Sequence, residues 1–250
     1  MSPMIDGGDF DLILLAEHRL GLPTLFYFKL MEVKDDWAFI LKLHALFEGT
    51  LKRLLEEKQT QFEFTDPIII DRDSFPTMLQ TAARHFLLDE IGEPIVSARH
   101  YLRALYQLRN RIAHDLEFIN LDLGRYVASL SEVEFQKAAR SLAISYPDQP
   151  YQQAPKPLRK VIETAQKVLP PKHRTTTVRE ALFDVAPKPA IWSGGGRTLT
   201  ALSHCLHIQP VGDSLGTDPR MAAKLQDLLH DPKVIELKRE LSKESGIDIT

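Results

Sequence analysis

The chain has 250 residues, of which 44% are hydrophobic and 26% are charged, as is typical of a globular protein with one core and some additional material. Its net charge of −3 argues against a protein that wraps duplex DNA through an overall positive field. Any nucleic acid would therefore bind in a local basic cleft. The only cysteine, Cys205, excludes an intramolecular disulfide and a cysteine-based zinc site, in agreement with a reducing compartment.

Signals for membranes, secretion, metals and cofactors are missing from the sequence. No apolar run approaches the roughly 20 residues that cross a bilayer, and the first residues are acidic where a secretory signal would be basic. We therefore expect a cytoplasmic protein with no membrane partner. We also expect no metal and no cofactor, because no histidines lie at metal-ligand spacing with a carboxylate, and the SGGG run at 193–196 lacks the rest of a phosphate-binding loop.

The spacing of apolar residues predicts an all-α protein whose residues 1–146 form a helical bundle with short connections. Residues 1–12 are expected to be a frayed lead, and residues 59–73 an extended connection. The helices predicted for the bundle are two short pieces within 11–31 that Gly21 and Pro23 separate, followed by 35–58, 74–88, 95–114, 121–130 and 132–145.

The composition changes after Tyr146. Residues 147–157 are rich in proline and polar side chains and are predicted to be a linker. Residues 158–250 are then expected to form a small helical appendage, either a second domain or an arm laid over the bundle or over another subunit. Short helices are predicted at 158–169, 177–185, 198–206, 221–229 and 234–241, with a glycine hinge at 194–196.

The stretch from Leu105 to Asp115 is the most unusual helix end in the chain, because it becomes basic and finishes in histidine. Arg109 continues the apolar face of this helix, so its guanidinium needs a carboxylate, a carbonyl or a phosphate. Glu48, on the predicted helix 35–58, is the expected carboxylate. The polar face of the same helix carries His100, Arg103, Gln107, Asn110 and His114.

With Arg109, Asn110 and His114 in this arrangement, residues 35–145 resemble the HEPN superfamily, whose members are four- to five-helix bundles with an Arg-(polar)-x3-to-5-His motif at a helix end. Glu48 stands where such proteins often carry an acidic residue on an earlier helix. The resemblance implies a HEPN-like bundle and a metal-independent endoribonuclease of a toxin or antiphage system, acting as a homodimer. The alternative is a non-catalytic regulatory or protein-interaction module, as in the mannitol-repressor group.

The resemblance has two limits. HEPN toxins that are paired with a minimal nucleotidyltransferase carry a tyrosine two positions after the histidine, and this chain has Leu116 there. Control by modification of that tyrosine is therefore not expected. The last hundred residues match no family that we recognise, which leaves room for a role in regulation, with an antitoxin or another defence protein as partner.

The expected chemistry assigns one task to each residue. Cleavage of RNA without a metal needs a base for the 2′-hydroxyl proton, for which His114 is suited, and a cation for the phosphate charge, for which Arg109 is suited. Asn110 would orient the site and Glu48 would hold Arg109. Three further cations are expected to widen the path for RNA phosphates or to form a solvated face: Arg99, Arg103 and Arg111.

One geometric problem follows from the helix itself. At about 100° per residue, Arg109 and His114 point roughly 140° apart, so a single copy brings them together only if the helix ends before His114. Pairing of two copies would also solve it. Two structural alternatives stay open: Arg109 and Glu48 form only a buried ion pair, or His114 serves only as a favourable residue at a helix C-terminus.

Overall fold

The computed structural model describes residues 7–61, 74–85, 93–114, 120–168, 171–207, 230–236 and 239. Within these residues the secondary structure is helical, apart from an isolated bridge between Pro150 and Thr177, so the predicted all-α class is confirmed. None of the described helices is long and apolar enough to cross a membrane. The predicted helix at 221–229 and most of the connection at 59–73 lie outside the described residues.

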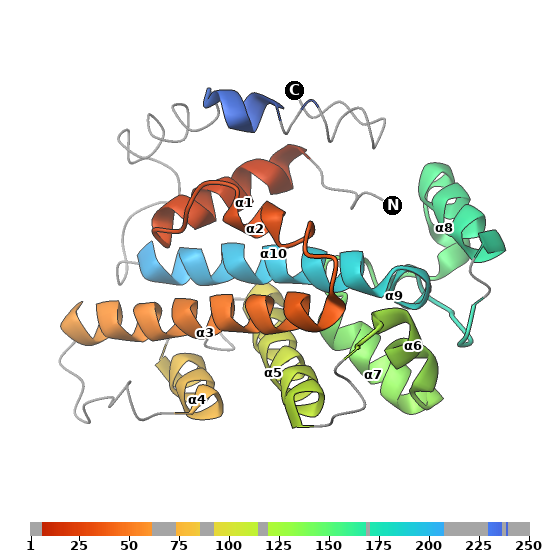
Figure 1. The fold of residues 1–250 in the computed structure, drawn as a ribbon, viewed down its shortest axis with the longest axis horizontal. Helices are drawn as coiled ribbons and strands as arrows, with labels where there is room; N and C mark the ends of the chain where they lie inside the picture. Colours follow the sequence, from red (N-terminus) through yellow and green to blue (C-terminus); the bar gives the residue numbers. More distant parts are fainter. Residues whose placement is uncertain are drawn as a thin grey trace.

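The helices of the first half lie close to where the sequence predicts them (Figure 1). The main differences are at their ends, where α3 runs three residues further and α5 includes Pro94 in its first turn, a position that tolerates proline. The bounds of these helices are α1 Gly7–Arg19, α2 Phe26–Lys29, α3 Asp36–Gln61, α4 Phe75–His85, α5 Glu93–His114, α6 Leu123–Ser129 and α7 Glu132–Leu142.

The N-terminal segment is folded onto the bundle, so the prediction of a frayed lead is wrong for residues 7–12. Phe10 in α1 is fully buried, because its ring packs against Phe28 with centroids 4.6 Å apart. The break between α1 and α2 is where Gly21 and Pro23 predict it, and Gly21 adopts the left-handed backbone that glycine favours, with φ of 62°.

The buried carboxylate of Glu17 holds the turn that follows α1. Its two oxygens accept the backbone N–H groups of Leu25, at 2.8 Å, and Tyr27, at 2.5 Å. Leu25 has a positive φ of 64°, which is unusual for a branched side chain, and the carboxylate satisfies the backbone there. Burial nevertheless raises the pKa of Glu17 to about 7.

The second half contains α8 (Lys156–Val168), α9 (Val178–Val185) and α10 (Pro187–His207). Figure 1 shows α10 running through the middle of the molecule beside α3, with α1 on one side and α5 crossing on the other. Ile191, Trp192, Leu199 and Leu202 are buried in the same core as α3 and α5. The expectation of an appendage outside the bundle is therefore wrong for α10, which is the central helix.

The predicted glycine hinge is also wrong, because Gly194, Gly195 and Gly196 lie inside α10. They allow two buried tyrosines to approach the helix. The Tyr101 hydroxyl donates to the carbonyl of Ile191 at 2.8 Å, and the Tyr27 hydroxyl donates to the carbonyl of Trp192. Side chains at these positions would collide with both rings, so here the glycines serve close packing and not bending.

The predicted linker is structured. Pro150 pairs with Thr177 across the isolated bridge, and Tyr151–Gln153 form a turn of 3₁₀ helix. Ala154 is buried, and with Leu158 on α8 it belongs to a small second core that α8 and α9 share. This part of the chain therefore joins α8 to the bundle through contacts, which proline-rich composition alone does not reveal.

Candidate functional site

The helix α5 carries the predicted site, and its neighbours fix it along its length. Tyr101 anchors its first half to α10, as described above. Near the other end, the indole nitrogen of Trp37 in α3 donates to the carbonyl of Ile112 at 3.3 Å. This bond holds the last turn against the start of α3. α5 stays α-helical through His114, so the broken last turn that would bring Arg109 and His114 together is not present.

Arg109 is half buried on the side of α5 that faces α3 and α4. One guanidinium nitrogen donates to the side-chain oxygen of Asn110 at 3.0 Å, so these two predicted site residues are in contact. The charge of Arg109 is also felt by His44 on α3. Burial and, to a smaller degree, this charge lower the pKa of His44 to about 4, so the imidazole is neutral at pH 7.

Glu48 does not hold Arg109. Its carboxylate lies 3.6 Å from the ring nitrogen Nδ1 of His44, and the side chain is 49% exposed. Among the residues that the structure describes, no ion pair joins Glu48 to Arg109. The reason is the helical register, since Glu48 stands one turn after His44 on the same face of α3 and meets this ring first. The predicted buried Arg109–Glu48 pair is therefore wrong.

His44 interacts with both residues that the sequence paired, since it contacts Glu48 and feels the charge of Arg109. Its ring packs between Phe75 of α4, with centroids 4.6 Å apart, and Tyr106 of α5, at 5.9 Å. Its Nε2 is buried and has no hydrogen-bond partner. Arg109 thus acts on a buried aromatic cluster, and no carboxylate of the described residues forms an ion pair with it.

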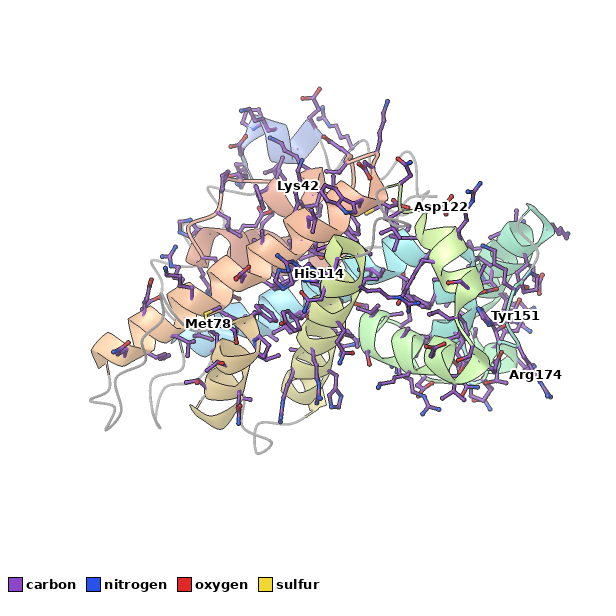
Figure 2. All side chains as sticks on the ribbon, turned by 60° about the horizontal axis from the view of Figure 1, so that its bottom comes forward. Lys42, Met78, His114, Asp122, Tyr151 and Arg174 are labelled. Atoms are coloured by element: carbon purple, nitrogen blue, oxygen red, sulfur yellow. The ribbon has the colours of Figure 1, made fainter. Side chains whose placement is uncertain are left out.

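His114 is exposed at the end of α5, where Figure 2 labels it. Arg109 lies five residues earlier on the same uninterrupted helix, so the two side chains leave the helix roughly 140° apart. One copy of the chain therefore does not assemble the complete predicted motif. It presents a guanidinium in contact with Asn110 on one side and an exposed imidazole at the helix tip.

The predicted RNA-binding arginines fall into two groups. Arg99, Arg103 and Arg111 are all exposed, but only Arg103 and Arg111 line a groove of about 570 Å³ between α5 and α7. Lys137 of α7 lines the opposite wall, and sequence reasoning did not single it out. The sequence places Lys137 on the polar face of an amphipathic helix. That pattern does not predict which other helix the polar face lies beside.

No described group of three histidine, cysteine or acidic side chains is arranged to hold a metal ion. Searches against protein-family models, curated proteins and solved structures find no match to this chain.

Proposed function

We propose that this protein is an endoribonuclease of the HEPN type, which cleaves RNA without a metal at a site completed by a second copy of the chain. The observation that carries the proposal is that one helix presents both Arg109, a guanidinium held by Asn110 with no carboxylate partner among the described residues, and His114, an exposed imidazole. Arginine cannot lose its charge in a protein, so a half-buried guanidinium without a carboxylate is suited to an anionic ligand.

The second copy is needed because of the direction of the side chains. Arg109 and His114 diverge on one helix, and the proposal is that two copies of α5 meet around a twofold axis so that the Arg109 of one lies beside the His114 of the other. The C-terminal end of α5 is open to such a partner, since His114 and its neighbour Ala113 are exposed.

The reaction that these groups support is transesterification at the ribose. His114 removes the proton from the 2′-hydroxyl, whose oxygen attacks the adjacent phosphorus. The bond from phosphorus to the 5′-oxygen breaks, the leaving oxygen takes up a proton, and the product is a 2′,3′-cyclic phosphate. Arg109 stabilises the negative charge that grows on the phosphate oxygens, and Asn110 keeps the guanidinium in place.

Glu48 has a different role from the one that the sequence predicts. It contacts His44, and the neutral, buried ring of His44 lies against Tyr106 on α5. Glu48 and His44 therefore shape the surroundings of Arg109 without neutralising it. Glu48→Gln should change RNA cleavage much less than a substitution of Arg109.

The test is cleavage of a fluorogenic RNA in the presence of a chelator. Wild-type protein should cleave it, and His114→Ala should reduce the rate by about 10²- to 10⁴-fold, the usual contribution of a general base. His18→Ala is the matched control, because His18 is a partly exposed histidine on α1, and it should cleave like wild type. Equal rates for the His114 and His18 variants, or loss of all cleavage in chelator, would refute the proposal.

A second candidate function is a non-catalytic binding module built on the same bundle. The divergence of Arg109 and His114 within one copy favours it, because a chain that never pairs has no complete site. In that case purified protein leaves RNA intact in every buffer, while still binding a partner. The two candidates therefore differ in the simplest measurement, the appearance of cyclic-phosphate ends.

A further inference from the structure

The groove between α5 and α7 has a floor and two walls of different chemistry. Its floor is apolar and is formed by the buried side chains of Leu108, Leu130 and Leu142. One wall is α5 and the other is α7, which lie side by side in Figure 1, and α6 closes one end. The polar lining residues are His100, Arg103, Gln107, Arg111, Glu134, Lys137 and Ser141.

The groove is positive in a protein whose net charge is negative. Among the described residues, it is lined by the cations Arg103, Arg111 and Lys137 and by one acidic side chain, Glu134, whereas the whole chain carries −3. A lining in which positive charges outnumber negative ones, over a low-dielectric floor, gives a positive local potential. Anionic ligands are therefore favoured at this groove.

Two of these cations are unused by the fold. Arg103 and Lys137 are exposed, and within the described part of the chain neither makes an ion pair or a side-chain hydrogen bond. Arg111 differs, because its guanidinium lies over the ring of Tyr126, 5.6 Å from the centroid, and its charge is felt by Glu134. Arg111 is thus positioned, while Arg103 and Lys137 remain available to a ligand.

The spacing of the cations favours a chain of phosphates over a single phosphate. Arg103 and Arg111 are eight residues apart on one face of α5, which corresponds to about 12 Å. That length spans about three nucleotides of a stacked strand at about 3.4 Å each. A mononucleotide carries one phosphate, and it would satisfy only one of these positions.

The same face of α5 leads to His114. Residues three and four apart share a helix face, so Arg103, Gln107, Arg111 and His114 follow one another along α5. His114 itself lies beyond the groove, about 4.5 Å along the helix from Arg111. A strand in the groove would therefore continue toward the exposed imidazole.

We infer that the α5–α7 groove binds the phosphate backbone of single-stranded RNA, with Arg103 and Lys137 contacting phosphates from opposite walls. The direction of the strand toward His114 rests on the function proposed above, but the binding groove does not. Because its contacts are charge to phosphate over an apolar floor, we expect little dependence on base sequence and a strong dependence on salt.

The experiment measures the affinity of wild-type protein for a labelled 2′-O-methyl RNA of twelve nucleotides. This RNA lacks the 2′-hydroxyl and cannot be cleaved by the proposed reaction. Arg103→Gln and Lys137→Gln should each weaken binding about tenfold at 50 mM salt and reduce the slope of log affinity against log salt by about 0.7. Lys160→Gln on α8 removes an equally exposed cation outside the groove and should leave both values unchanged.

A fourth variant tests the sign of the charge. Glu134 accepts the backbone N–H of Ser131 at 2.9 Å in the cap of α7, a role that glutamine also fills. Glu134→Gln should therefore keep the fold and tighten RNA binding, the opposite of the lysine and arginine variants. A merely structural role for the groove does not predict this reversal.

Three results would overturn the inference. One is unchanged affinity and salt slope in both the Arg103 and Lys137 variants. Another is competition by AMP at concentrations comparable to the RNA, which would indicate a mononucleotide site. The third is loss of self-association in Lys137→Gln without a change in salt slope, which would indicate a protein contact. If the protein binds the 2′-O-methyl RNA but cleaves no RNA, only the proposed reaction is refuted. If the protein cleaves RNA but the Arg103 and Lys137 variants bind as tightly as wild type, only the proposed groove is refuted.

Discussion

The helices α5 and α10 are nearly equal in length, at 22 and 21 residues, and yet they use their polar groups differently. In α10, Thr198 donates to the carbonyl of Gly194 at 2.9 Å and Thr200 to that of Gly196 at 3.1 Å, so these hydroxyls are satisfied within the helix. In α5, Arg103 and His114 are exposed, and within the described residues neither side chain has a hydrogen-bond partner of this kind.

This difference separates a helix that builds the core from one that presents a surface. Three consecutive glycines bring α10 close to Tyr27 and Tyr101, which suits the centre of a bundle. α5 is buried on the side of Tyr101 but keeps cations on the side facing α7. Exposed charges of this kind contribute little to the stability of the core, so this side of α5 is the one suited to contacts with a ligand.

The largest expected effect tests whether the two functional residues of α5 act from different copies. Arg109→Ala and His114→Ala should each be inactive in RNA cleavage. When the two variants are mixed in equal amounts and exchange subunits, half of the dimers contain one copy of each variant. Each such dimer has one intact site out of two, so roughly one quarter of the wild-type rate should return. The measurement is the initial rate of cleavage before and after mixing.

A mixture as inactive as its components, although exchange is demonstrated with differently labelled copies, would show that no site is shared between subunits. Glu48→Gln mixed with wild type is a suitable control, because Glu48 touches His44 and not the proposed reacting groups.

The second effect concerns the central position of α10. In Gly194→Ala the new methyl group would meet the backbone carbonyl of Leu142 and the Tyr101 ring, 2.9 Å away. Backbone cannot move aside as a side chain can, so we expect a loss of about 2 kcal/mol or more in the free energy of unfolding, although alanine is the better helix former. Chemical denaturation measures it.

Gly49 provides the matched comparison for Gly194. It also lies inside a helix, α3, but a β-carbon there would meet nothing within 4 Å. Gly49→Ala should therefore increase the free energy of unfolding by up to about 1 kcal/mol. Equal effects at the two glycines would mean that α10 is not packed as described.

The third effect tests whether His44, which lies between α3 and α5, is buried away from water and uncharged. The pKa of His44 falls from 6.5 to about 4 on folding, so between these values the unfolded chain binds a proton that the folded protein does not. Stability should therefore fall as the pH falls, and the contribution of His44 should decrease by about 2 kcal/mol between pH 7 and pH 5.

The measurement compares urea unfolding of wild type and His44→Phe at both pH values. Phenylalanine keeps the ring packing against Phe75 and Tyr106 but cannot be protonated. Glu17 acts in the opposite direction, because its folded pKa of about 7 makes stability fall as the pH rises from 4.5 to 7, and this effect cancels in the comparison. Identical pH dependence in both proteins would contradict the buried, neutral state of His44.

Much of the local structure follows from the sequence. The spacing of apolar residues predicts α3, α5 and α7 within a few residues of their observed ends, since this spacing reports helix faces directly. The same spacing draws attention to Arg109, because it places a cation among the apolar residues of one helix face. Asn110 is in contact with Arg109 as its position next to it suggests.

The errors share one cause, which is that they concern partners distant along the chain. A run of three glycines, as at 194–196, is compatible both with a hinge and with a close contact inside a helix. Only the packing of Tyr27 and Tyr101, which are distant in sequence, distinguishes the two. Likewise, Glu48 and Arg109 are compatible in charge, but the register of α3 gives Glu48 to His44. Composition at residues 147–157 did not reveal the bridge to Thr177.

By itself, the sequence determined an all-α protein, the faces of its helices and the residues of α5 that have no place in a core, because periodicity and charge act over a few residues. The tertiary structure alone decided that α10 is the central helix, that Glu48 contacts His44 and not Arg109, and that Lys137 faces Arg103 across a groove. Those features depend on which helix faces pack against each other. This packing joins segments that are often more than a hundred residues apart in the sequence.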